Sequence, residues 1–316
     1  MASIIIIGAG MAGLACAQGL VSAGHAVILI DKGRGAGGRM AARRMASPSG
    51  DVTFDHGAQY FSARSQDFQT QVKQWADAGV VGLWEAAGEG AWVGTPAMNA
   101  PLKAMARDLD VRWGMRATGL SRTSTGWAVE AENGTVITAD AVVTAMPAEQ
   151  TADLLAPVAG PFAEAARAAP SAPCWTVMLA FSRTLATEED CVRGTDAEAL
   201  GWAARNSSKP GRGTTETWVI QAGADWSAEN LEAPPAAVEA RMMEALAVRL
   251  GIDLPNPVLR SNHRWRYARS GCAAGGDFWD PGMRLGVCGD WLMGPQVEDG
   301  WRSGTLLARR MAASLG

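Results

Sequence analysis

The residues best suited to chemistry lie near the N-terminus, where three glycines have the G-x-G-x-x-G spacing of a dinucleotide-binding turn. Gly8 permits the tight turn, Gly10 lets the backbone approach a pyrophosphate, and Gly13 lets a helix pack closely on the preceding strand. Asp31 ends the next apolar segment, where its carboxylate can accept hydrogen bonds from ribose hydroxyls. We favour a bound dinucleotide over a glycine-rich turn without a ligand. Three neighbours are also predicted contacts: Met11, Ala12 and Lys32.

A second glycine-rich run indicates which dinucleotide is bound. Residues 33–39 read GRGAGGR and follow the acidic residue almost at once. Paired glycines allow positive φ and close backbone approach, and an arginine beside them can contact the second phosphate of a pyrophosphate. Gly38, Arg39 and Met40 are therefore predicted cofactor contacts. Arg43 and Arg44 continue the basic run and are interpreted as a solvated face.

A third motif closes the chain. Gly289 and Asp290 follow a short apolar strand, and residues 297–304 read VEDGWRSG. An acid after a strand and a glycine suits a ribityl or pyrophosphate contact. Motifs at both ends of the chain thus converge on one cofactor, which favours FAD over a dissociable nicotinamide. The predicted contacts at this end are Gly289, Asp290, Asp299, Gly300 and Trp301.

Two internal segments favour a substrate pocket. Residues 54–61 read FDHGAQYF, which we interpret as a flavin-facing loop, with a plain β-turn as the alternative. Residues 263–267 read HRWRY, and alternation along a strand puts His263, Trp265 and Tyr267 on one face. That face either stacks on a flat ligand or is simply half buried. The cofactor contacts predicted from the first segment are His56, Gly57, Ala58 and Gln59.

These motifs resemble those of the renalases, a branch of the FAD-dependent amine oxidase superfamily. The resemblance covers nearly the whole chain and rests on four ordered motifs, at residues 54–61, 204–212, 263–268 and 289–291. It implies an FAD oxidase of misreduced nicotinamide dinucleotides, the 2- and 6-dihydro isomers of NAD(P). Hydride passes to the flavin and O2 takes the electrons, so the products are NAD(P)+ and H2O2.

The resemblance also implies the residues around the nicotinamide, which are Tyr60, Asn206, His263 and Trp301, with Arg264 or Arg212 meeting phosphate. From the residues alone, Tyr60 suits a pocket or a packing role equally, and residues 207–212 suit a phosphate site or an exposed loop.

The family often has glycine where this chain has Asp299, so a negative charge is added close to the predicted flavin. Redox tuning or substrate preference could differ accordingly. Two alternatives remain, a flavin amine oxidase or desaturase acting on another small molecule and a non-catalytic flavoprotein. The sequence has no lysine after Lys209, which disfavours an amine oxidase, although Trp291 and Trp301 could form an aromatic cage.

The elements that position these motifs begin with a β-α-β unit. Residues 3–7 form an apolar β-branched strand, residues 11–23 a helix that Gly24 ends, and residues 26–30 a second strand. Further helices are predicted at residues 64–80, 97–109, 148–169 and 231–250, and further strands at residues 111–113, 118–122, 127–130, 135–138, 139–147, 174–181, 218–222 and 284–287.

The predicted fold class is α/β, with a Rossmann-like FAD-binding domain and an inserted substrate domain containing a mixed or antiparallel sheet, as in amine oxidases and p-hydroxybenzoate hydroxylase. The FAD-binding domain is predicted to comprise residues 1–63, 92–150 and 270–316, and the substrate domain residues 64–91 and 151–269.

Composition agrees with an enzyme for small molecules. The chain has 316 residues and a net charge of −4, so neither nucleic acid nor an anionic membrane is an expected partner. No segment approaches membrane-spanning length and no basic leader precedes the first strand, so a cytoplasmic location is expected. Five cysteines form no C-x-x-C pair and three histidines lie far apart, so no metal site is predicted.

Overall fold

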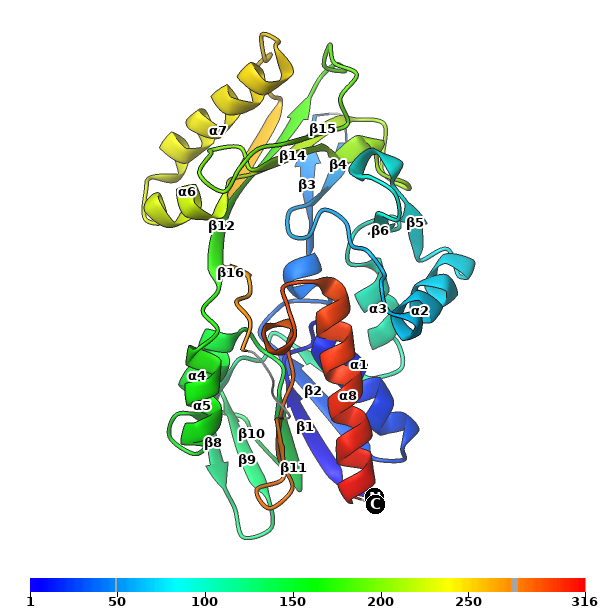
Figure 1. The fold of residues 1–316 in the computed structure, drawn as a ribbon, viewed down its shortest axis with the longest axis vertical. Coiled ribbons are helices and arrows are strands. Elements are labelled where there is room, and N and C mark those ends of the chain that lie inside the picture. Colours follow the sequence, from blue (N-terminus) through cyan, green and yellow to red (C-terminus); the bar gives the residue numbers. More distant parts are fainter. Residues whose placement is uncertain (49, 274–277, 316) are drawn as a thin grey trace.

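A computed structural model describes residues 1–48, 50–273 and 278–315, and a six-stranded and a five-stranded sheet form its two halves (Figure 1). The helices are α1 (Met11–Ser22), α2 (Gln66–Asp77), α3 (Ala100–Ala106), α4 (Ala148–Leu155), α5 (Gly160–Arg167), α6 (Ala224–Glu229), α7 (Pro235–Leu250) and α8 (Val297–Leu315).

The six-stranded sheet has the order β17 (Trp279–Asp280), β18 (Leu285–Val287), β11 (Ala141–Thr144), β1 (Ser3–Ile7), β2 (Ala26–Asp31) and β7 (Asp110–Trp113). The five-stranded sheet has the order β13 (Cys191–Arg193), β14 (Trp202–Arg205), β15 (Glu216–Gln221), β12 (Ala172–Phe181) and β16 (Leu259–Arg269). Three smaller sheets comprise β3 (Ala42–Ser47) with β4 (Gly50–Asp55), β5 (Val81–Leu83) with β6 (Trp92–Gly94), and β8 (Ala117–Arg122), β9 (Trp127–Ala131) and β10 (Val136–Ala139).

Strand β1 organises the first half because it runs parallel to both β2 and β11. Ile4 and Ile6 enter the core shared with α1 and α8, whereas Ile5 and Ile7 enter the core shared with α4 and α5. A strand buried on both faces needs a continuous apolar run, which explains the four successive isoleucines. The crossover through α1 then presents the glycine turn at the carboxyl edge of the sheet.

The C-terminal part of the chain returns to this N-terminal unit. Strand β18 pairs in parallel with β11, and α8 lies along α1 (Figure 1). A Cβ on Gly304 would lie only 2.0 Å from the carbonyl oxygen of Ala12, so the close approach of the two helices requires glycine there. The motifs at the two ends of the chain are thereby brought to the same edge of the sheet.

The second half is built on β12, which pairs antiparallel with β15 and β16. Val177 and Leu179 pack with α7, whose Met242 and Leu246 are fully buried. Met178 and Ala180 point to the other face and pack with Phe54 of the β3–β4 hairpin. Alternation along this strand therefore separates a helix-covered face from a face turned toward the hairpin.

The predicted α/β class, with a Rossmann-like sheet and a separate antiparallel sheet, is confirmed, whereas several predicted bounds are wrong. Residues 148–169 form two helices rather than one, because residues 156–159 leave the helical path between α4 and α5. Helix α7 begins at Pro235, which fits proline's preference for the first helical turn. The predicted domain boundaries stay predictions, and residues 274–277 of the last segment lie outside the described residues. None of the helices in the described ranges is long and apolar enough to cross a membrane.

Candidate active site

A cavity of about 1620 Å³ is lined by residues from both main sheets. Its wall includes the N-terminal glycine turn, the β3–β4 hairpin, residues 56–58, strand β16 and the loop before α8. Ligand sites usually measure roughly 300–1,000 Å³. This cavity can therefore hold a dinucleotide with a second ligand beside it.

The three glycines of the N-terminal turn are glycine for different geometric reasons. Gly8 has a φ of 109°, and a Cβ there would lie 2.5 Å from the carbonyl oxygen of Ala145. A Cβ on Gly13 would lie 2.0 Å from the carbonyl oxygen of Gly8. Gly10, in contrast, has no atom within 4 Å of its Cβ position and lines the cavity. Gly8 and Gly13 thus serve the fold, whereas Gly10 keeps space open for a ligand.

Asp31 holds this turn from the end of β2. Its Oδ2 accepts the Ala9 N–H at 2.7 Å, and its Oδ1 accepts the Gly33 N–H at 2.6 Å. The carboxylate lines the cavity with both oxygens fixed by backbone donors. Ribose hydroxyls can still donate to the remaining lone pairs, because a carboxylate accepts about four hydrogen bonds.

Arg39 and Asp290 bring the two ends of the chain together. The Arg39 Nη2 lies 2.6 Å from Asp290 Oδ1, and its Nη1 donates to Ser270 Oγ at 2.5 Å. Ser270 in turn donates to Asp290 Oδ2 at 2.8 Å. Both charged residues line the cavity. Arg39, the predicted phosphate contact, is therefore also held by an ion pair that the sequence did not indicate.

The backbone of residues 56–58 forms one wall. A Cβ on Gly57 would lie 2.0 Å from the carbonyl oxygen of Arg39, so only glycine allows this approach. The Gly57 carbonyl accepts from Gln221 Nε2 at 2.7 Å and from Gln59 Nε2 at 3.0 Å. The peptide is therefore tied both to β15 and to its own loop.

A row of paired residues crosses the five-stranded sheet beside residues 56–58 and continues this wall. Trp202 pairs with Gln221, Gln221 with Thr176, and Thr176 with His263. Directly paired residues share a face, and all of them except the buried Thr176 line the cavity. Trp265, one alternation further along β16, donates from Nε1 to the His56 carbonyl at 2.8 Å.

The two histidines in this wall are neutral. Burial, followed by the charges of His263 and Arg43, lowers the pKa of His56 to about 3. Burial and then Arg43 lower the pKa of His263 to about 4. The rings lie 5.1 Å apart edge to face, and His56 stacks on Trp265 at 5.2 Å. These two histidine rings are therefore uncharged at pH 7, and His263 stands edge-on to both His56 and Trp265.

Arg43 reaches this surface, so its interpretation as a solvated residue is wrong. Its Nη2 lies 3.1 Å from His263 Nδ1, and it lines the cavity. The β3–β4 hairpin, which was not predicted, carries it there. Arg44 is mostly exposed and pairs with Asp51.

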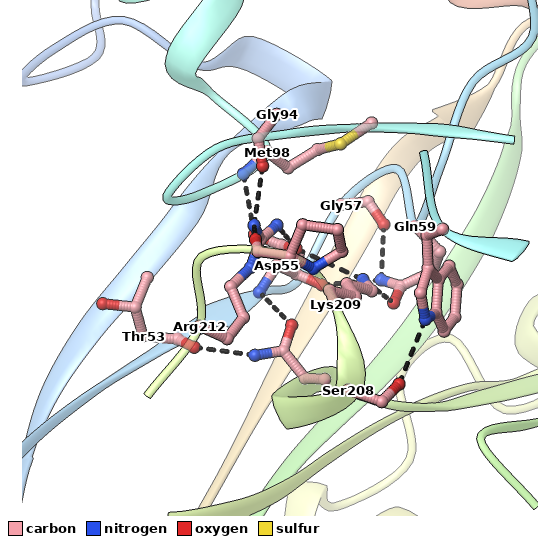
Figure 2. Close-up of polar contacts among 12 residues, drawn as sticks. Thr53, Asp55, Gly57, Gln59, Gly94, Met98, Ser208, Lys209 and Arg212 are labelled. Atoms are coloured by element: carbon pink, nitrogen blue, oxygen red, sulfur yellow. Dashed lines mark hydrogen bonds and ion pairs between the residues drawn. The ribbon is translucent and has the colours of Figure 1, made fainter. Parts of the chain in front are cut away.

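Behind residues 56–58 lies a buried charge network that the sequence did not indicate as such (Figure 2). Asp55 Oδ2 accepts from Lys209 Nζ at 3.2 Å and pairs closely with the guanidinium of Arg212. Lys209 also donates to Gln59 Oε1 at 3.0 Å, and Asp55 Oδ1 accepts the Met98 N–H at 2.9 Å. Arg212 is thus a buried partner of Asp55, and its predicted contact with a phosphate is wrong.

The pKa values reflect this pairing. Burial alone would raise the pKa of Asp55, but Lys209 and Arg212 outweigh it and lower that pKa below its ordinary value. Burial lowers the pKa of Lys209 to about 8 against the opposing attraction of Asp55. The network contains two cations and one anion, and all three side chains are at most 2% exposed.

Three of the four residues predicted around the nicotinamide lie outside the cavity lining as the structure describes it. Asn206 is fully buried and bridges the Thr53 carbonyl and the Asp55 N–H. Tyr60 packs on Trp202 at 5.6 Å, and Trp301 packs on Phe68 at 5.3 Å. Only His263 lines the cavity, so direct contact of the other three with a ligand stays a prediction.

The first turn of α8 accounts for Asp299. Its Oδ2 accepts the Gln296 N–H at 3.3 Å, which is the N3-to-N-cap bond of a capping box. Burial raises the pKa of Asp299, and its neighbours Gln296, Val297 and Gly300 line the cavity although Asp299 itself does not. The aromatic cage considered for Trp291 is wrong, because that side chain is fully buried and Trp202 and Trp265 line the cavity instead.

Residues 81–312 match the family model described as flavin containing amine oxidoreductase, and residues 6–78 match a NAD(P)-binding Rossmann-like domain. The chain therefore belongs to the flavin containing amine oxidoreductase family. A cofactor-binding variant of putrescine oxidase superposes with a TM-score of 0.76 at 14% identity, and cyclohexylamine oxidase from Brevibacterium oxydans IH-35A with 0.73 at 13%. Each match covers 99% of both chains, and at these identities it shows the fold alone.

The protein is thus an FAD-dependent oxidoreductase, and its cavity fits that cofactor. When bound, FAD supplies the hydride acceptor. The open space at Gly10 and the N-terminus of α1 suit its pyrophosphate. The predicted contacts that line the cavity are Gly8, Gly10, Met11, Ala12, Asp31, Lys32, Gly38, Arg39, Met40, His56, Gly57, Ala58, Gly289, Asp290 and Gly300. Those outside the lining are Gly13, Gln59, Asp299 and Trp301.

Proposed function

We propose that this protein oxidises the 2- and 6-dihydro isomers of NAD(P), as the renalases do, with O2 as the final electron acceptor. The substrate loses a hydride and becomes NAD(P)+, and O2 takes two electrons and two protons to give H2O2. Dihydronicotinamides are strong hydride donors, so no side chain has to remove a proton from the reacting carbon. The neutral histidines of the wall are compatible with this requirement.

The observation that carries the proposal is the charge of the cavity. Nine arginine or lysine residues and four aspartates line it, although the whole chain has a net charge of −4. Glu232, Asp51 and Glu132 neutralise part of this excess by pairing with lining arginines, which leaves two surplus positive charges. The two phosphates of FAD offset both. With FAD bound, the cavity therefore has no surplus negative charge to attract an ammonium, whereas its lining arginines can still pair with the phosphates of a substrate.

A flavin amine oxidase is the second candidate, because Trp202, Trp265 and Tyr267 give the cavity an aromatic surface. Such a surface can hold an amine by cation–π attraction. The solved relatives include a putrescine oxidase and a cyclohexylamine oxidase. The amine candidate requires the positive charge of the nearby lining arginines to be offset at the point where the amine binds.

Anaerobic mixing in a stopped-flow instrument distinguishes the two. We expect the dihydro isomers of NAD(P) to bleach the flavin rapidly, and ordinary 4-dihydro-NAD(P)H and a panel of amines to bleach it far more slowly. The dihydro isomers of the mononucleotide, which lacks the pyrophosphate, should have a higher KM. Bleaching by an amine and by neither dihydro isomer would overturn the proposal in favour of the amine oxidase.

Arg264 lines the cavity, but its guanidinium is paired with Glu232 and with the Leu231 carbonyl, so a phosphate has to draw it away from these partners. On the proposal that it does, Arg264→Gln should raise KM for the dinucleotide about 10-fold, which is the scale of one phosphate contact. It should change KM for the mononucleotide much less. Arg309→Gln is the matched control, because Arg309 is exposed on α8 and pairs with Asp67. Equal changes in KM for both substrates would contradict a phosphate contact at Arg264.

A further inference from the structure

Arg43 contacts two residues of the same face of β16 from the β3–β4 hairpin. Its Nη2 lies 3.1 Å from His263 Nδ1, and its Nη1 donates to Ser261 Oγ at 3.4 Å. Ser261 and His263 are two residues apart in one strand, so their side chains point to the same side. The guanidinium therefore spans two successive positions on this face of β16, of which His263 lines the cavity.

This contact fixes the tautomer of His263. A guanidinium has only donors, and it stays charged at any pH at which the protein is folded. Nδ1 of His263 must therefore accept, and the proton of the neutral ring lies on Nε2. Protonation of the ring would place a second cation 3.1 Å from the guanidinium.

The remaining groups around His263 do not offset this effect. His56, across the edge-to-face contact, is itself held neutral, and Asp55 behind it is paired with Lys209 and Arg212. On β12 the facing residue is Thr176, and Cys174 near it has its pKa raised to about 12 by burial. Glu232 is paired with Arg264 and Arg266. Arg43 is thus the charge in direct contact with the ring.

We propose that Arg43 is a positioning and specificity residue, which keeps His263 as a neutral Nε2–H donor and sets a fixed cation beside the substrate ring. A neutral donor suits the carboxamide oxygen of a dihydronicotinamide. A dihydronicotinamide ring is uncharged when it binds, whereas the fixed cation opposes an ammonium at the same place, so one residue both orients the favoured substrate and disfavours the binding of amines. The inference about substrate choice rests on the proposed function, whereas the inference about the tautomer does not.

Nitrogen-15 NMR of histidine-labelled holoprotein tests the tautomer directly. The chain has three histidines, and His25, whose Nδ1 accepts the Ala2 N–H, provides an internal reference for the Nε2–H form. We expect His263 to be Nε2–H in the wild type with a pKa of about 4. In Arg43→Gln the pKa should rise but stay below its ordinary value of 6.5, because burial is the larger cause and persists.

Kinetics test the specificity. Arg43→Gln should lower kcat/KM for the dihydro isomers roughly 10- to 100-fold, the scale of one charge-assisted contact, and should raise the rate of flavin reduction by amines relative to them. Arg43→Lys should restore much of the discrimination, and Arg309→Gln should change neither substrate class.

The positioning role and the specificity role can be refuted independently of each other. An Nδ1–H tautomer in the wild type, or a His263 pKa that is the same in Arg43→Gln, would overturn the positioning role whatever the substrate is. If the dihydro isomers do not reduce the flavin at all, the proposed function fails and the specificity role fails with it, while the NMR result still decides the tautomer.

Discussion

The charge network around Asp55 makes a quantitative prediction about stability. Asp55→Asn keeps the shape of the side chain and an acceptor for the Met98 N–H. It removes the negative charge that Lys209 and Arg212 share, and both of these cations are at most 2% exposed. Removing one partner of a buried ion pair lowers the free energy of unfolding by about 3–5 kcal/mol. We expect a loss of that size at pH 7.

Lys209→Met provides the contrast within the same network. It leaves Asp55 paired with Arg212, so the remaining buried charges balance. It also ends the desolvation of an ammonium, which offsets the lost hydrogen bond to Gln59. We expect a loss of less than about 2 kcal/mol, because an apolar side chain of similar length replaces a buried charge.

The difference in stability between the wild type and Lys209→Met should depend on pH, and its sign follows from the pKa of Lys209. Lys209 has a pKa of about 8 in the folded protein and 10.5 in its unperturbed state. Between these values the unfolded chain holds a proton that the folded protein has released, so stability rises with pH. Relative to Lys209→Met, the wild type should therefore gain up to about 3 kcal/mol between pH 8 and 10.5, at about 1.4 kcal/mol per pKa unit. Below pH 8 the difference should be flat.

Urea unfolding of both variants and the wild type, each with and without saturating FAD, measures these quantities, since the bound cofactor adds its own stabilisation. Loss of Asp55 also removes the attraction that opposes burial, so the pKa of Lys209 should fall below 8 in Asp55→Asn. The reasoning fails if Lys209→Met is as destabilising as Asp55→Asn. It also fails if the wild type shows no gain over Lys209→Met above pH 8.

Three further predictions concern the cofactor. Gly10→Val should fold with a normal urea midpoint yet retain no FAD after gel filtration, whereas Gly13→Ala should lose about 1–3 kcal/mol of stability, because its Cβ would lie 2.0 Å from a carbonyl oxygen; full FAD loading of Gly10→Val would exclude the turn as the site. Asp299→Asn keeps an acceptor for the helix cap and removes a charge, so the flavin potential measured by spectroelectrochemistry should rise; an unchanged potential would mean that the carboxylate is beyond electrostatic reach of the ring. Arg39→Met should lower FAD occupancy and thermal stability together, because it leaves the buried carboxylate of Asp290 without its ion pair; normal occupancy would contradict a role for this pair in the site.

Local patterns predicted the parts of the fold that depend on neighbours in sequence. The β-α-β unit and the strand ending at Phe181 follow from apolar runs and glycine positions, and the return of the C-terminal motif to the N-terminal turn follows from its own glycines and acid. Helix α8, which carries part of that motif, was not predicted. The β3–β4 hairpin was not predicted, because residues 42–55 are polar and basic on one face. The hairpin is buried by its contact with β12, which its own composition does not indicate. Arg43 was misinterpreted for the same reason.

The candidate site shows the same limit more strongly. The cofactor turn could be predicted, because its three glycines all lie within residues 8–13. The pairing of Arg39 with Asp290 spans 251 positions and that of Asp55 with Arg212 spans 157, so no local pattern could reveal either. Asn206 is an example. It is a polar residue of a motif that suits a substrate contact, but its side chain instead binds the backbone at the end of β4.

The loop at residues 55–59 links these observations, because its two sides have different tasks. His56, Gly57 and Ala58 line the cavity, whereas Asp55 and Gln59 bind the buried ammonium of Lys209. The carbonyl of Gly57 accepts from Gln59, so the backbone that faces the ligand is held by a side chain of the charge network. A change in that network should therefore alter the position of the cavity wall as well as the stability. Only residues 56–58 lie between Asp55 and Gln59, so this segment is too short to absorb a large displacement of either residue. We therefore expect Lys209→Met, although it lowers the stability only slightly, to slow flavin reduction. The effect on that rate should be larger than the effect on cofactor binding.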